Sequence, residues 1–195
     1  YLIKPVNPNQ ILLSLKKILD RNKLITEKTV VNYQQEFRKI SMDLMNARDH
    51  DDWKDIYKKL VLWELELENI EDSQMSTILE DQKREADSAF FKFVKRNYYD
   101  WLHADDKPVL SHTVFKEYAK PNLSENKKTL LIMIDNLRFD QWKTIEPLFG
   151  NMYNVDKEQM YYSILPSATQ YARNAFFSGL MPAEIQKIFP DKWLN

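Results

Sequence analysis

The sequence predicts a mixed fold, in which a helical bundle is followed by the beginning of an α/β domain. Three observations predict it. Through most of residues 22–102, apolar residues recur at alternating threes and fours, which is the spacing of one helix face. Two short apolar runs, residues 129–134 and 161–165, each lead into a helical pattern, as buried parallel strands do. Glycine occurs only 2 times in 195 residues, which is typical of a helix-rich chain.

Composition and charge narrow the class of protein. Apolar residues make up 44% of the chain, enough for a hydrophobic core, and a formal net charge of −1 predicts no nucleic-acid partner from bulk charge. The sequence contains no cysteine, which excludes disulfides and thiolate metal sites within it and fits a reducing compartment. No apolar run approaches the roughly 18 to 20 residues of a membrane span, and no signal peptide starts the sequence. We therefore expect a cytoplasmic protein without membrane insertion.

The first 21 residues predict the tail of a strand and one helix. The residues up to Lys4 have the pattern of a strand end, and Pro5 turns the chain. Asn7 and Pro8 suit the N-cap and the first turn of a helix. The helix then carries one apolar stripe, formed by Ile11, Leu12, Leu15, Ile18 and Leu19. Taken alone, this segment predicts a capped amphipathic helix with an exposed lysine before it.

Residues 22–122 predict a bundle of three helices. The helical pattern breaks at residues 46–52, where Asp49 is placed to cap the second helix, and Ser73 is placed to cap the third. Short connections favour antiparallel neighbours. The polar segment 122–128 then marks the boundary before the first apolar run.

Few residues in the predicted bundle are candidates for a catalytic or metal-binding site. The three histidines, His50, His103 and His112, lie in or beside loops without a second ligand at i+3 or i+4, so we interpret them as surface residues. Ser111 is a candidate cap of a short segment. The aromatic and basic stretch 90–101 could stack RNA bases or pack the bundle against the next domain, and we favour packing.

Asp135 carries the first candidate chemistry. It follows the apolar run 129–134, and ligands of open α/β sheets bind at that end of the strands. A carboxylate there suits a divalent metal ion. Asp is also a common N-cap, so Asp135 could instead cap the helix predicted from Phe139 to its stop at Gly150.

Thr169 is the second candidate for chemistry. It follows Pro166, which ends the apolar run 161–165. In a first helical turn, free N–H groups and the helix dipole favour an anion, and a hydroxyl there can attack phosphorus. Arg173 lies four residues further on the same helix face, where it could clamp a phosphate oxygen. The alternatives are a plain helix cap for Thr169 and a surface arginine for Arg173.

Residues 133–140 and 165–182 resemble the PglZ branch of the alkaline phosphatase superfamily, and Lys4-Pro5 with the helix after it resembles the end of a receiver domain. The order of these parts is similar to that of the PorX response regulators of Bacteroidetes. The resemblance implies three parts: the C-terminal end of a receiver domain at 1–21, a helical bundle linker domain at 22–122, and the incomplete N-terminal part of an alkaline-phosphatase-like domain at 123–195.

The resemblance also implies roles for single residues. Lys4 would contact the phosphoryl group of the receiver, with a cis Lys4–Pro5 bond. Asp135 would be a metal ligand, and Thr169 the metal-bound nucleophile of a two-zinc site. The implied activity is hydrolysis of phosphodiesters such as small oligonucleotides. The implied setting is control by a sensor histidine kinase, a homodimer, and a role in type IX secretion.

The sequence departs from the superfamily after Thr169. The remaining ligands of such a site are Asp and His residues at later strand ends, but only two acids, Glu184 and Asp191, and no histidine follow. We therefore expect an internal fragment of a longer protein, which alone neither binds two zinc ions tightly nor turns over substrate. The rival hypothesis is a non-catalytic signalling and dimerisation module that binds a regulatory partner.

Overall fold

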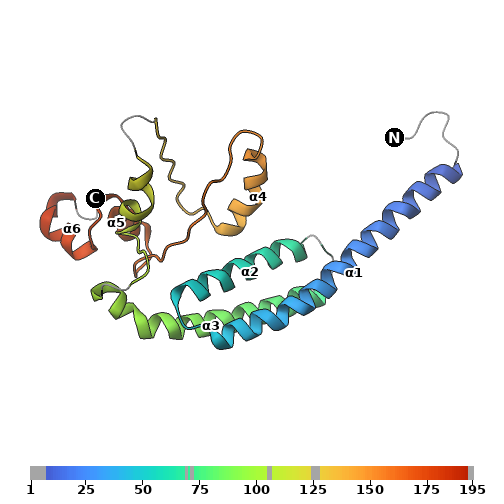
Figure 1. Ribbon diagram of the computed structural model, residues 1–195, viewed down its shortest axis with the longest axis horizontal. Helices are drawn as coiled ribbons and strands as arrows, with labels where there is room; N and C mark the ends of the chain where they lie inside the picture. Colours follow the sequence, from blue (N-terminus) through green and yellow to red (C-terminus); the bar gives the residue numbers. More distant parts are fainter. Residues whose placement is uncertain (1–7, 69, 71–72, 105–106, 124–127, 193–195) are drawn as a thin grey trace. The chain divides into compact units, whose positions relative to one another are not determined.

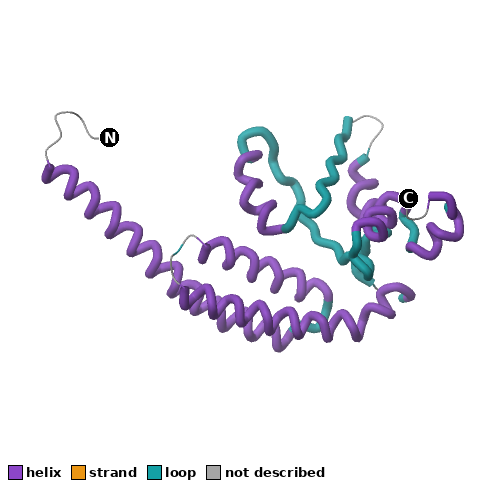
Figure 2. Tube along the Cα trace, turned by 180° about the vertical axis from the view of Figure 1, so that it is seen from behind, coloured by secondary structure: helices purple, strands orange, loops and turns teal. Residues whose placement is uncertain are grey.

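The computed structural model describes residues 8–68, 70, 73–104, 107–123 and 128–192. These residues are mostly helical, and none of them is assigned to a strand (Figure 1, Figure 2). The chain divides into two compact units, Tyr1–Phe93 and Val94–Asn195. The predicted receiver strand, Lys4 and the cis Lys4–Pro5 bond lie outside the described residues.

Three long helices build the first unit: α1 (Pro8–Asn46), α2 (His50–Glu68) and α3 (Ser73–His103), whose last residues from Val94 onward belong to the second unit. The predicted helix starts at Pro8 and Ser73 and the predicted break after Asn46 are confirmed. No described helix is long and apolar enough to cross a membrane.

The core of the first unit lies between the three helices. Tyr33 and Ile40 of α1 are fully buried, at 0% exposure. The residues packed with them come from the apolar stripes of the other two helices: Trp53, Ile56, Leu60, Leu67, Met75, Leu79 and Ala86. Removing such stripes from water is the main force that holds amphipathic helices together, so the helical period predicted this core.

A buried polar cluster joins α1 to α3 within this core. Gln82 is only 2% exposed, and its Nε2 donates to the Phe37 carbonyl oxygen at 3.0 Å and to Ser41 Oγ at 3.1 Å. The Tyr33 hydroxyl donates to Gln82 Oε1 at 3.5 Å. Both ends of the buried amide therefore have partners, as a polar group away from water requires. Burial raises the pKa of the Tyr33 hydroxyl to about 12.

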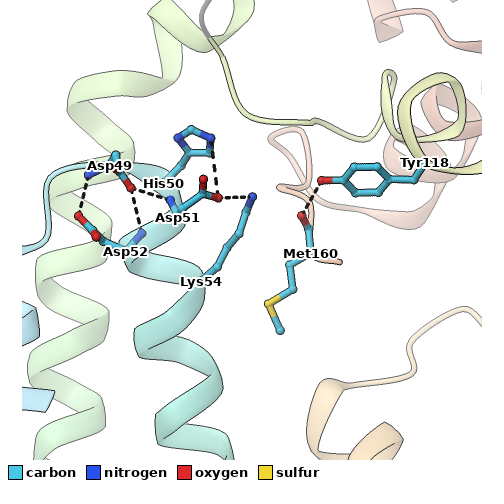
Figure 3. A network of polar contacts seen from close by, with 7 residues as sticks. All are labelled: Asp49, His50, Asp51, Asp52, Lys54, Tyr118 and Met160. Carbon is cyan, nitrogen blue, oxygen red and sulfur yellow. Dashed lines mark hydrogen bonds and ion pairs between the residues drawn. The ribbon is translucent and has the colours of Figure 1, made fainter. Parts of the chain in front are cut away.

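The start of α2 is capped by carboxylates (Figure 3). Asp49 Oδ1 accepts the N–H groups of Asp51 and Asp52, both at 2.9 Å. Asp52 Oδ2 also accepts the N–H of Arg48 at 2.8 Å. The hydrogen bond from Arg48 and a second from Asp49 lower the pKa of the Asp52 carboxyl. Asp49 is thus the cap that the sequence predicted.

The second unit combines the end of α3 with six short helical segments: η1 (Phe115–Ala119), η2 (Lys120–Asn122), α4 (Phe139–Phe149), α5 (Thr169–Ser178), α6 (Pro182–Ile188) and η3 (Pro190–Lys192). The two helices predicted here, α4 and α5, form as expected. Gly150 ends α4, and Gly179 ends α5 with φ of 70°, a left-handed conformation that glycine adopts without strain.

The two predicted strands form no sheet among the described residues, so the expected α/β arrangement is not seen there. Residues 129–134 have no regular secondary structure, and Leu130, Ile132 and Ile134 are 82%, 69% and 58% exposed. In the second run, Tyr162 forms one parallel bridge with Leu110. The physical reason is that a strand needs a neighbour to take its backbone hydrogen bonds, and residues 129–134 have none within the described part.

Candidate functional site

Asp135 lies in a turn between the first apolar run and α4. Asn136, next to it, has φ of 60°, which lies in the left-handed region that asparagine tolerates. The N-cap of α4 is Arg138, whose N–H donates to Gln141 Oε1 at 3.1 Å. Asp135 therefore does not cap this helix, and its carboxylate is available for another role.

Arg173 connects the two predicted junctions. Its Nη1 lies 3.9 Å from Asp135 Oδ2, and the two side chains are 51% and 48% exposed. A half-exposed ion pair of this length contributes at most about 1 kcal/mol to stability. The contact matters because it shows that the carboxylate before α4 lies beside the guanidinium of α5.

Thr169 is the first residue of α5, and Ala168 is the N-cap. The Ala168 carbonyl accepts the N–H groups of Tyr171 at 2.9 Å and Ala172 at 3.0 Å. Within the described residues, the hydroxyl of Thr169 and the N–H groups of Thr169 and Gln170 make no hydrogen bond. Thr169 is therefore not a side-chain cap. It offers a hydroxyl and two amides at the positive end of the helix dipole.

Tyr161 adds a phenol whose charge environment includes Asp135. Although the residue is 45% exposed, desolvation of its hydroxyl raises its pKa, and the negative charge of Asp135 adds to the rise. The hydroxyl therefore stays protonated at neutral pH and can donate a hydrogen bond. Nothing in the sequence pattern distinguishes Tyr161 from the rest of its apolar run.

The start of the second apolar run is held by residues earlier in the same unit. The Tyr162 N–H donates to the Val109 carbonyl oxygen at 2.9 Å. The Tyr118 hydroxyl donates to the Met160 carbonyl oxygen at 3.2 Å (Figure 3). The ring of Trp101 packs against that of Tyr162, with centroids 5.0 Å apart. This contact confirms packing for the Trp101 end of the aromatic stretch.

The last residues of this run are held by two hydroxyls. The Ile164 N–H donates to Ser111 Oγ at 3.1 Å, and the Leu165 N–H donates to the Tyr98 hydroxyl oxygen at 2.6 Å. Ile164 and Ser111 are buried, at 0% and 1% exposure. The predicted helix cap at Ser111 is wrong, because its hydroxyl bonds the second run. The partners are 53 and 67 residues apart, so no local spacing in the sequence points to them.

The three histidines differ from one another. His103 is exposed, its Nδ1 lies 2.8 Å from the Tyr99 carbonyl oxygen, and its ring stacks on that of Tyr99 at 4.3 Å. His112 has a buried Nδ1 that finds no hydrogen-bond partner among the described residues. Desolvation and, to a smaller extent, the charge of Lys107 lower the pKa of His112. His103 is exposed, as interpreted from the sequence, whereas His50 and His112 are only partly exposed.

The described residues do not by themselves complete a metal centre. Among the described residues, no three His, Asp or Glu side chains converge, whereas a protein-bound zinc ion usually has four ligands, at least three of them from the protein. Asp135 and the Thr169 hydroxyl offer two donors, and Asp135 already faces the cation of Arg173. The predicted two-zinc site is therefore not filled by these residues.

Two protein families match the chain. Residues 23–102 match the PorX response regulator linker domain, and residues 114–194 match the BREX system PglZ alkaline phosphatase-like domain. No curated protein matches the chain. The first match covers most of the three-helix bundle, and the second includes Asp135, Thr169 and Arg173. The chain belongs to the PorX-type proteins with a PglZ domain, so its linker is that of a response regulator and its output part is alkaline phosphatase-like.

Proposed function

We propose that the chain is part of a response regulator whose output domain hydrolyses phosphodiesters such as small oligonucleotides. The observation that carries the proposal is the Asp135–Arg173 contact of 3.9 Å. It brings the carboxylate of one junction to the helix that begins with Thr169. A nucleophile, a cation and free amides then lie on the first turns of α5.

The proposed reaction uses these groups together. The Arg173 guanidinium binds a nonbridging oxygen of the phosphodiester. The Thr169 Oγ attacks phosphorus in line with the leaving oxygen, and the N–H groups of Thr169 and Gln170 stabilise the charge that develops on the phosphoryl oxygens. The proton of the threonine hydroxyl is transferred to the leaving oxygen, which departs as an alcohol. Water then attacks the phosphorus of the phosphothreonine intermediate, the bond between phosphorus and Thr169 Oγ breaks, and Oγ takes a proton from the water, so that a phosphomonoester is released.

Zinc dependence is part of the proposal. In the complete domain, Asp135 and Thr169 would act as two zinc ligands, and other parts of the protein would provide the rest. Residues 129–134 would there be a strand of an α/β sheet. That placement would also cover the apolar side chains that are exposed in the structure.

The biological setting is proposed from the family. A response regulator linker implies a partner from a two-component system, and we propose a sensor histidine kinase, with Lys4 contacting the phosphoryl group of a receiver. A homodimer and a role in type IX secretion complete the proposal.

The test is Thr169→Ala in the full-length protein, with hydrolysis of bis(p-nitrophenyl) phosphate as the assay. We expect kcat to fall at least about 100-fold, because the attacking oxygen is gone. Thr144→Ala is the matched control, since Thr144 lies on α4 and its hydroxyl donates only to the Asp140 carbonyl oxygen. Unchanged hydrolysis by Thr169→Ala would remove Thr169 as the nucleophile.

The same ion pair also favours a second candidate function, a non-catalytic module that binds a regulatory partner. A carboxylate that is already neutralised by Arg173 is a weaker ligand for a cation. The zinc content of the full-length protein separates the two functions. About two zinc ions per chain support the enzyme, and a zinc-free protein that still binds its partner supports the module.

A further inference from the structure

We infer that Tyr98 is a positioning residue for Thr169: the end of α3 holds the segment that leads into the nucleophile helix. The inference rests on the proposed role of Thr169. The Tyr98 hydroxyl oxygen accepts the N–H of Leu165 at 2.6 Å, across 67 residues of sequence.

Two aromatic residues of α3 fix this contact. Tyr98 and Trp101 are three residues apart and share a helix face, with their rings edge to face at 6.3 Å. Trp101 is 7% exposed and packs on Tyr162, three residues before Leu165. The ring of Trp101 therefore seats α3 against the segment, and the Tyr98 hydroxyl sets the position of the segment's end.

Leu165 is the last anchored residue before α5. Pro166 has no N–H to donate, and within the described residues the backbone of Ser167 bonds no other element. The Ala168 carbonyl bonds only within the start of α5. Among the described residues, the Leu165–Tyr98 hydrogen bond is therefore the last one that holds the preceding chain before Thr169, next to the bond between Ile164 and Ser111. Attack on phosphorus is sensitive to such placement, because a shift of about 1 Å can cost two orders of magnitude in rate.

The contact joins the two matched families. Tyr98 and Trp101 lie in the part that matches the PorX linker domain, and Leu165 and Thr169 lie in the part that matches the PglZ domain. The linker thus contributes a residue that the PglZ part needs for its geometry. A helix that belongs to a signalling linker is in this way bonded directly to the segment that carries the nucleophile.

The role of Tyr98 differs from a purely structural one. Leu165 is 53% exposed, so water can replace the hydroxyl as a partner of its N–H when the hydroxyl is removed. The fold should then persist while the segment moves more freely. Tyr98→Phe makes this change and keeps the ring that packs on Trp101.

The experiment compares Tyr98→Phe with Tyr99→Phe in the full-length protein. Tyr99 is 71% exposed and one residue away, so it is a matched control. For Tyr98→Phe we expect kcat to fall about tenfold with KM changed less than twofold, and faster amide hydrogen exchange in a peptide that covers residues 165–169. Melting temperature and zinc content should match the wild type, and Tyr99→Phe should change none of these values.

A second arm separates this inference from the proposed function. In a Thr169→Ala background, Tyr98→Phe should leave the residual rate within twofold, because no nucleophile remains to be positioned. If Thr169→Ala is fully active, the proposed function fails, whereas faster exchange at residues 165–169 would still show that Tyr98 holds the segment. Wild-type kcat together with unchanged exchange in Tyr98→Phe would overturn the inference. So would a tenfold loss accompanied by a lower melting temperature.

Discussion

The three-helix core of the first unit and residues 129–134 of the second unit differ in how far their apolar side chains are buried. In the first unit, Ile40 and Leu79 are buried to 0% and 4% exposure, whereas Ile132 in the second unit is 69% exposed. A helix makes its backbone hydrogen bonds internally, so an apolar stripe needs only a matching face. A strand needs a neighbour for its backbone as well. α1 makes the same point, since it remains helical where Leu12 and Leu19 are exposed, at 63% and 66%.

The largest expected effect tests this contrast directly. Ile40→Ala removes a fully buried side chain and should lower the free energy of unfolding by about 2–5 kcal/mol. In this 195-residue chain, Ile132→Ala makes the same chemical change at a site that is 69% exposed and should alter the free energy of unfolding by less than about 0.5 kcal/mol. Urea denaturation followed by far-ultraviolet circular dichroism measures both. Equal losses would show that residues 129–134 are buried and that the contrast is wrong.

A smaller effect sharpens the picture of the first unit at alkaline pH. Free tyrosine ionises near pH 10, whereas the pKa of buried Tyr33 is about 12. As pH rises, the unfolded state loses this proton first. The contribution of Tyr33 to stability is therefore complete below pH 10 and is lost between pH 10 and 12, by about 3 kcal/mol. The measurement is urea unfolding at both pH values for the wild type and Tyr33→Phe.

The difference between the two proteins isolates the tyrosine from the lysines that also titrate there. Tyr33→Phe keeps the ring and should lack this alkaline loss. If the variant and the wild type lose the same free energy between pH 10 and 12, Tyr33 is not buried as described.

The smallest effect concerns the second unit at acid pH. Burial lowers the pKa of His112 below 6.5, Lys107 adds to the fall, and Glu184 opposes it. The neutral ring is the form that the folded state prefers, so its contribution is present above pH 6.5 and is lost as pH falls through the lowered pKa. Proton NMR titration of the His112 ring should give a midpoint below 6.5. His112→Gln should weaken the acid loss of stability, and a midpoint at or above 6.5 would contradict the desolvation of the ring.

Most of the helical structure could be predicted from the sequence because its signals are local. Pro8, Asp49 and Ser73 mark helix starts, and Gly150 and Gly179 mark helix ends, through backbone preferences that depend only on neighbouring residues. Strand formation could not be judged in the same way, since it depends on a partner segment that spacing does not identify.

The candidate site could be predicted in part for the same reason. Asp135 and Thr169 stand out because each lies where an apolar run meets a helix, and Arg173 follows from its spacing to Thr169. Tyr98 and Ser111 could not be found, because their contacts with Leu165 and Ile164 cross more than 50 positions of sequence. A single hydrogen bond between a hydroxyl and a distant N–H produces no periodic pattern in the sequence.

The buried amide of Gln82 restricts how the bundle can move. Its Nε2 donates hydrogen bonds to two groups of α1, the Phe37 carbonyl oxygen and the Ser41 hydroxyl oxygen, which are four residues or about one helical turn apart. If α1 moved along α3 by a fraction of a turn, the buried amide would lose its hydrogen-bond partners. A buried polar group without a partner raises the free energy of the folded state. A shift of α1 along α3 must therefore first break the two hydrogen bonds of Gln82. We expect such a shift to occur in one step between two positions and not as a gradual movement.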